Sequence, residues 1–143
     1  MKELLDKKLE NDIISIVEKG NEYQDNGSCT DALAKYKSAW ELIPEPKFDW
    51  EISNWVSACL YSVYFDMDDF ITAKEWAEIT LKTKDSDIDT APSIDLGMVC
   101  YELSQYEEAY KYFDDAYSYG KARAFKERPK KYLEFYLERK KKK

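Results

Sequence analysis

The fold of this chain is decided by residues 13–46, which read IISIVEKGNEYQDNGSCTDALAKYKSAWELIPEP. Small and aromatic residues recur in this stretch at the places where two packed helices would touch. These residues are Gly20, Tyr23, Ala32, Tyr36, Ala39 and Pro44. A small residue allows two helices to approach each other, and an aromatic residue interlocks with the neighbouring helix. We therefore expect residues 13–46 to form a helix-turn-helix unit.

Two further copies of this unit follow at 54–87 and 90–123. The second copy keeps the apolar and small residues of the template at Leu60, Tyr64, Phe70 and Ala73. It departs from the template at Tyr61, Ala77 and Thr80, which replace a Gly, an aromatic residue and a small residue. The third copy keeps Leu96, Gly97, Tyr106, Ala109, Phe113 and Ala116. The pattern resembles the tetratricopeptide repeat, and the resemblance implies an all-α solenoid.

The hydrophobic spacing predicts seven helices within a single domain, 1–143. The first has an apolar face of Leu5, Leu9, Ile13, Ile16 and Val17. Asp31 begins the second, which Pro44 ends. The next two run over 49–64 and 70–82, the fifth is opened by Thr90-Ala91-Pro92 or by Ser93 and runs to about Leu103, and the sixth covers 106–120. The last, at about 129–140 after Pro129, would be a cap that covers the apolar face of the third repeat.

The sequence offers no catalytic arrangement of residues. Without histidine there is no Ser-His-Asp or Cys-His arrangement and no HExxH motif, and neither GxGxxG nor GxxxxGK[ST] occurs. Cys29, Cys59 and Cys100 form no CxxC motif, which indicates free thiols in a reducing compartment. With no signal-peptide or membrane-spanning pattern, we expect a cytoplasmic, non-enzymatic protein that uses no cofactor and no metal.

Two acidic clusters have the composition, but not the spacing, of calcium loops. They are Asp66, Asp68 and Asp69, and Asp85, Asp87 and Asp89. Counted as EF-hand loops, neither has Gly in the sixth place or Glu in the twelfth. We interpret the first cluster as a turn and the second as a loop between repeats.

Charge is divided unevenly along the chain. Residues 1–120 carry 11 Lys and Arg against 26 Asp and Glu, a net charge of −15, whereas residues 121–143 carry 11 against 3, a net charge of +8. The acidic body would repel a phosphate backbone, so nucleic acid is not an expected partner. The basic end is either a solvated tail or a segment that contacts nucleic acid, a membrane or the acidic body of the chain itself.

In the repeats that this chain resembles, the first helix of each unit lines a concave groove. The resemblance therefore implies a partner-binding surface made of Asn21, Gln24, Asp25, Trp55, Ser62, Phe65, Asp66, Met98, Tyr101 and Glu102. The thirteenth place of every copy is acidic: Asp25, Asp66 or Glu102. Apolar anchors beside a row of acids favour a basic protein partner. The Lys and Arg clamp of chaperone-binding repeats is missing, since Val17, Ala91 and Asp95 occupy its places.

A narrower resemblance concerns two segments, Pro44-Glu45-Pro46-Lys47 with Trp50 and Trp55, and 125–132 with Phe135 and Leu137. Both are similar to segments of small bacterial tetratricopeptide proteins, some of which act as immunity proteins that bind and neutralise polymorphic toxins. This resemblance implies a non-catalytic immunity protein that binds a toxin domain, and the acidic body of the chain favours a basic one. We expect no membrane and no small-molecule partner. A generic scaffold, or a peptide-sensing adaptor with the same repeats, is the alternative.

Overall fold

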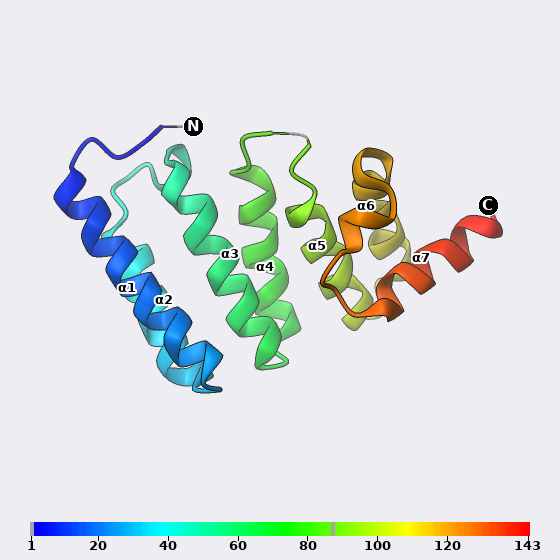
Figure 1. Cartoon of the computed structure of the whole chain (residues 1–143), viewed down its shortest axis with the longest axis horizontal. Coiled ribbons are helices and arrows are strands. Elements are labelled where there is room, and N and C mark those ends of the chain that lie inside the picture. The colour runs from blue at the N-terminus through cyan, green and yellow to red at the C-terminus, as the bar shows by residue number, and fades with distance from the viewer. Residues whose placement is uncertain (1, 87) are drawn as a thin grey trace. The chain divides into compact units, whose positions relative to one another are not determined.

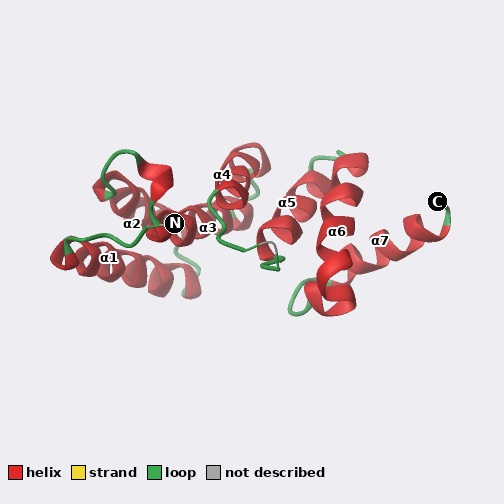
Figure 2. Ribbon diagram, turned by 90° about the horizontal axis from the view of Figure 1, so that it is seen from above, coloured by secondary structure: helices red, strands yellow, loops and turns green. Residues whose placement is uncertain are grey.

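The computed structural model of this chain describes residues 2–86 and 88–143. In these residues it contains seven α-helices and two 3-10 helices, joined by loops (Figures 1 and 2). In chain order the elements are α1 (Lys7–Asp25), α2 (Cys29–Leu42), η1 (Lys47–Asp49), α3 (Glu51–Asp66), α4 (Phe70–Lys82), α5 (Ala91–Glu102), α6 (Tyr106–Gly120), η2 (Lys121–Phe125) and α7 (Lys130–Lys141). Within the described ranges no helix has the length and apolar character needed to cross a membrane.

The chain packs into two compact units. Unit 1, Met1–Asp85, contains the helix pairs α1/α2 and α3/α4, and unit 2, Ser86–Lys143, contains the pair α5/α6 followed by α7. The expectation of a single domain over 1–143 stays a prediction. Asp87, the last residue of the predicted second repeat and a member of the second acidic cluster, lies outside the described residues.

All three helix pairs turn in the same way. The residue in the fifteenth place of each repeat has a left-handed backbone, with φ of 82° at Gly27, 61° at Asp68 and 63° at Ser104. The N–H of the following residue then donates to a carbonyl five residues earlier. These bonds are Ser28 to Tyr23 at 2.8 Å, Asp69 to Tyr64 at 2.9 Å and Gln105 to Cys100 at 2.8 Å. This is the Schellman closure of a helix C-terminus, so each first helix ends at the same place in its repeat.

A ring packed against a small residue joins the two helices of each repeat. A Cβ added to Gly20 would lie 2.6 Å from the Tyr36 ring, and one added to Gly97 would lie closer still to the Phe113 ring. The second repeat has the opposite arrangement, with the large Tyr61 on its first helix and the small Ala77 on its second, both buried. Tyr61 and Ala77, which both depart from the sequence template, therefore compensate each other: the large and the small residue have changed places between the two helices.

The predicted bounds of the fourth and sixth helices are confirmed by α4 and α6. The first helix begins at Lys7, because the extended Asp6 caps it and accepts a hydrogen bond from the Leu9 N–H at 3.0 Å. Leu5 therefore does not belong to its apolar face: it is 92% exposed, and Leu4 is buried instead. The second helix begins at Cys29 rather than at Asp31, which lies in its first turn.

The third helix begins later than predicted, at Glu51, and ends later, at Asp66. Residues Lys47–Asp49 form η1, and Trp50 is extended between the two helices. The Trp50 indole N–H donates to the Pro44 carbonyl at 2.9 Å, which holds this extended residue in place. The last helix begins at Lys130, one residue after Pro129, and ends at Lys141.

Aromatic rings fill the core of unit 2. Tyr132 and Tyr136 of α7 are buried. Tyr132 lies against Phe113 of α6, with ring centroids 6.0 Å apart, and Tyr136 stacks on Tyr110 at 5.2 Å and on Phe125 of η2 at 6.0 Å. The helix predicted as a cap therefore covers apolar rings of the third repeat.

Candidate partner-binding site

The predicted site residues of unit 1 form a polar cluster on α1 and α3. Gln24 lies at its centre, and its amide Nε2 donates to Ser62 Oγ at 3.0 Å and to Asp66 Oδ2 at 2.8 Å. The Tyr36 hydroxyl donates to Asn21 Oδ1 at 2.6 Å and to Gln24 Oε1 at 2.8 Å. Burial, the largest cause, and nearby Cys59 and Asp25 raise the pKa of Tyr36, so it remains a neutral donor.

The acids of this cluster have no cationic partner. Asp25 and Asp66 are exposed, and no Lys or Arg in the described part of the chain forms an ion pair with either. The hydrogen bond from Gln24 orients the Asp66 carboxylate without neutralising it. The cluster therefore presents two negative charges to solvent, next to the hydrogen-bonded side chains of Gln24, Asn21 and Tyr36.

Two aromatic side chains of α3 belong to the predicted site, Phe65 next to Asp66 and Trp55 near the other end of the helix. Trp55 is 37% exposed and lines a pocket of about 300 Å³ with Ile14, Leu4, Ile52 and three glutamates, Glu3, Glu10 and Glu51. Phe65 is half-buried and packs edge-on against Phe70, with ring centroids 5.1 Å apart. Val17, which occupies a clamp place of chaperone-binding repeats, is completely buried and cannot contact a partner.

In unit 2 the predicted site residues contact Arg128 and the C-terminal helix α7 of the same chain. Met98 is 6% exposed, and Arg128 Nη1 lies 3.1 Å from its sulfur. The Tyr101 ring meets Tyr132 edge-on at 5.4 Å and Phe135 edge-on at 5.2 Å. A partner could reach Met98 or the covered side of Tyr101 only if these side chains moved.

Glu102, the third acid of the predicted row, is already paired. Lys131 Nζ lies 2.9 Å from its carboxylate, and the Tyr132 hydroxyl donates to it at 2.7 Å. Although desolvation alone would raise the pKa of Glu102, the bonds from Lys131 and Tyr132 outweigh it and lower that pKa. Glu102 therefore stays ionised.

Asp95, near Glu102 on α5, is the most enclosed acid of this surface. Its Oδ1 lies 2.5 Å from Arg128 Nη1, and both side chains are largely buried. Desolvation is the dominant influence and raises the pKa of Asp95, while Arg128 opposes the shift.

The basic C-terminus contacts the acidic surface of its own unit. Arg139 pairs with Glu107 at 3.2 Å, Lys140 with Asp114 at 4.0 Å and Lys143 with Glu107 at 3.8 Å. The interpretation of this segment as a purely solvated tail is wrong, because the acids of α6 hold it.

Among the described residues, no three His, Cys, Asp or Glu side chains come together to hold a metal ion. Cys29, Cys59 and Cys100 are not joined by disulfide bonds. Burial raises the pKa of Cys59 to about 12, so this thiol is protonated at neutral pH and a poor nucleophile.

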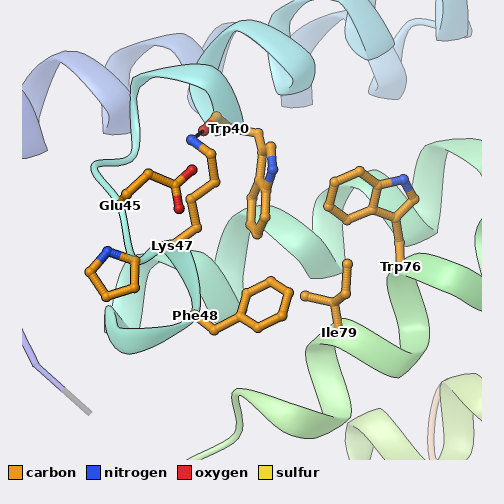
Figure 3. Close-up of a pocket in the computed structure, with 7 residues that line it drawn as sticks. Trp40, Glu45, Lys47, Phe48, Trp76 and Ile79 are labelled. Atoms are coloured by element: carbon orange, nitrogen blue, oxygen red, sulfur yellow. Dashed lines mark hydrogen bonds between the residues drawn. The ribbon is translucent and has the colours of Figure 1, made fainter.

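Sequence reasoning missed a second pocket, of about 440 Å³, on α2, η1 and α4 of unit 1 (Figure 3). Its lining residues are Trp40, Glu45, Pro46, Lys47, Phe48, Trp76 and Ile79. In the sequence, the Pro-Glu-Pro-Lys segment is distinguished only by its resemblance to segments of other proteins. No periodic pattern links it to Trp76 on another helix, so only the folded chain brings these residues together.

Comparison with known proteins supports the fold. No protein-family model matches the sequence, and no curated protein matches it either. Among solved structures, the chain is similar to the C-terminal TPR-containing domain of a Plasmodium falciparum FK506-binding protein, at 22% identity and a TM-score of 0.72. That match covers 98% of this chain and 97% of the other. It is also similar to MamA, at 18% identity and a TM-score of 0.67, over 92% of this chain and 80% of MamA.

Both similarities are at the level of fold. They confirm the predicted class: an all-α fold of three tetratricopeptide-like helix-turn-helix repeats followed by a C-terminal helix.

Proposed function

We propose that this protein is a non-catalytic protein-binding module whose α1/α3 surface in unit 1 binds a basic partner. One observation carries the proposal: Asp25 and Asp66 stand exposed without a cation, while the equivalent Glu102 of unit 2 is neutralised by Lys131. The half-buried Phe65, next to Asp66 in the chain, supplies apolar contact area beside these charges, and the exposed Trp55 lies eleven residues earlier on α3. Charge would steer association, and the rings would hold the complex.

The test is co-purification of partners from the native cell, comparing wild type with an Asp25→Lys/Asp66→Lys variant. We expect a basic protein to bind wild type and to be lost from this variant, mainly through a slower association rate measured at low salt. An Asp31→Lys/Glu75→Lys variant is the matched control, since it makes the same charge change at exposed acids of α2 and α4. Equal loss in both variants would contradict this site, as would a partner that is acidic.

The binding surface also predicts a division of roles between charge and rings. Phe65→Ala should speed dissociation and leave the association rate nearly unchanged, because a buried aromatic anchor typically contributes about 2 kcal/mol or more. Surface plasmon resonance with the purified partner measures both rates. An unchanged dissociation rate, with the fold intact by circular dichroism, would remove Phe65 from the interface.

The narrower proposal is that the partner is a toxin domain and the protein its immunity factor. It is supported by the segments around Pro44–Lys47 and 125–132 and by the acidic character of unit 1, which suits a basic nuclease. Cells expressing the toxin should survive only with the cognate protein. If a deletion strain competes normally against a parent shown to express the toxin, the protein is a scaffold or adaptor instead.

A further inference from the structure

The pocket on α2, η1 and α4 is lined mainly by apolar side chains, three of which are aromatic. Trp40 meets Trp76 edge-on, with ring centroids 5.0 Å apart, and Phe48 is tilted against Trp40 at 6.4 Å. Figure 3 shows Trp40 between Lys47 and Trp76, and Phe48 directed toward Ile79. Phe48 is 47% exposed, which is a large exposed fraction for a phenylalanine at the wall of a pocket. The walls therefore offer apolar contact area to a partner.

The only cation of the pocket is already bound within the chain. Lys47 Nζ donates to the carbonyls of Ile43 at 2.6 Å, of Trp40 at 2.9 Å and, more weakly, of Glu41 at 3.5 Å. An ammonium group has three donors, so these carbonyls of the α2 C-terminus occupy all of them. The ammonium also lies 5.8 Å from the Trp40 ring centroid. Lys47 thus fixes η1 against α2 and is not available to an anionic ligand.

The remaining charge of the pocket is negative. Glu45 lines it, and no ion pair to Glu45 occurs within the described ranges. Unit 1 as a whole has 10 Lys and Arg against 18 Asp and Glu, a net charge of −8. A ligand that carries Lys or Arg beside its apolar part would meet a complementary charge at Glu45.

The backbone conformation of the ligand follows from what the pocket lacks. A strand would need an open sheet edge, and the described residues contain no strand, only one isolated bridge between Lys2 and Trp50. A phosphorylated or acidic segment would need an unoccupied cation. A polyproline II segment needs neither, because its backbone groups stay in water while its rings pack against aromatic side chains.

We propose that this aromatic pocket docks an extended, proline-containing segment of a partner protein, with Lys or Arg next to the proline. Proline rings would pack against Trp40, Phe48 and Trp76, and the basic residue would pair with Glu45. A volume of about 440 Å³ is within the range of peptide-sized and drug-sized sites. The site is separate from the α1/α3 surface and does not depend on the function proposed for it.

The test is a titration of the full-length protein, followed by tryptophan fluorescence and calorimetry, with a synthetic proline-rich peptide that ends in Arg-Arg. We expect saturable binding below about 1 mM. A peptide with Ala and Ser in place of proline should bind about tenfold more weakly or not at all. Replacing Arg-Arg by Glu-Glu should weaken binding as well, because Glu45 would then repel the peptide.

Substitutions in the pocket test whether the peptide binds there. Phe48→Ala should weaken binding about fivefold or more, and Trp76→Phe should also weaken it while keeping an aromatic ring for the fold. Tyr119→Ala is the matched control, an exposed aromatic residue of unit 2 that is 58% exposed and far from this pocket in the sequence. Glu45→Gln should remove the preference for Arg-Arg over Glu-Glu.

Three results would overturn the proposal. The first is that the proline-rich peptide shows no saturable binding at concentrations up to about 1 mM. The second is that Phe48→Ala and Trp76→Phe leave binding unchanged in folded protein. The third is that the proline-free peptide binds equally well. A helical apolar peptide that binds here more tightly than the proline-rich one would assign the pocket to another class of partner. Charge reversal at Asp25 and Asp66 should leave peptide binding unchanged, so failure of one proposal does not decide the other.

Discussion

Units 1 and 2 are built from the same kind of helix pair, but their acidic residues have different partners. Unit 1 has a net charge of −8, whereas unit 2, with 12 Lys and Arg against 11 Asp and Glu, has a net charge of +1. Asp66 receives a hydrogen bond from a neutral amide, Gln24, while the equivalent Glu102 is bound by Lys131 and Tyr132. The difference arises because unit 2 ends in a basic helix and unit 1 does not.

The contacts of α7 show which groups bind to the acidic surface of this repeat. Its cations pair with carboxylates of α5 and α6, and its rings cover Tyr101 and Phe113. Phe65 and Phe70 of unit 1 repeat the edge-on arrangement of Tyr101 and Tyr106, since both ring pairs cross at 71°. A basic partner with exposed rings would therefore find on unit 1 the groups that α7 binds on unit 2.

The largest effect should come from removing the ring that anchors α7. Tyr136 is completely buried, stacks on Tyr110 and donates to Asp114 at 2.5 Å. Tyr136→Ala should cost about 3–5 kcal/mol of unfolding free energy, the range for deleting a large buried ring. Leu137→Ala, at a residue 37% exposed, is the control and should cost far less.

Hydrogen exchange tests whether this loss is confined to one unit. Amides of α5–α7 should lose most of their protection in Tyr136→Ala, while those of α1–α4 should stay close to wild type. Equal loss in both units would show that unit 1 also depends on α7, and the contrast between the units would then fail.

Breaking the buried ion pair between Arg128 and Asp95 should give the next largest loss of unfolding free energy. Arg128→Ala leaves the Asp95 carboxylate enclosed without a counterion, which should cost about 3 kcal/mol at pH 7. Arg139→Ala breaks a pair whose Glu107 side chain is 77% exposed, so it should cost about 0–1 kcal/mol. Urea denaturation measures both, and equal costs would contradict the distinction between the enclosed and the exposed pair.

The cost of Arg128→Ala should also depend on pH. The folded-state pKa of Asp95 is already raised, chiefly by desolvation, and losing Arg128 raises it further. A carboxyl whose pKa is higher in the folded state is destabilising when ionised, and protonation relieves it. The deficit relative to wild type should therefore shrink as pH falls from 7 toward the ordinary carboxyl range.

The sequence predicts the backbone of the fold better than it predicts the candidate site. The bounds of α4 and α6 follow from hydrophobic spacing, because each helix buries one face along its whole length. The left-handed turns at Asp68 and Ser104 are hidden, because only the first repeat uses the glycine that would indicate one. Tertiary packing imposes the same Schellman closure on residues with weaker preferences for it.

The site was harder to predict, because sequence spacing places a residue on a helix face without showing what covers it. Asn21, Gln24 and Ser62 do come together with Asp66, since each repeat presents the same face of its first helix. Met98 and Glu102 have equivalent places in the third repeat but lie against Arg128, Lys131 and Tyr132. The excess of Lys and Arg after residue 120 was the available signal, and pairing it with particular acids required the fold.

The smallest and most discriminating prediction compares two tyrosine hydroxyls. Tyr132 donates to an ionised carboxylate, Glu102, whereas Tyr36 donates to the neutral amides of Asn21 and Gln24. At pH 7, Tyr132→Phe should cost about 1.5–3 kcal/mol and Tyr36→Phe about 0.5–1.5 kcal/mol, because bonds to charged groups are stronger. The pKa of Glu102 is lowered in the folded protein, so its contribution is present above its ordinary pKa of 4.5 and is lost as pH falls through the folded value. The cost of Tyr132→Phe should therefore decrease in acid, while that of Tyr36→Phe stays constant. Urea midpoints for the three proteins between pH 7 and pH 3 measure this, and parallel curves for the two variants would show that Glu102 carries no charge-dependent contact with α7.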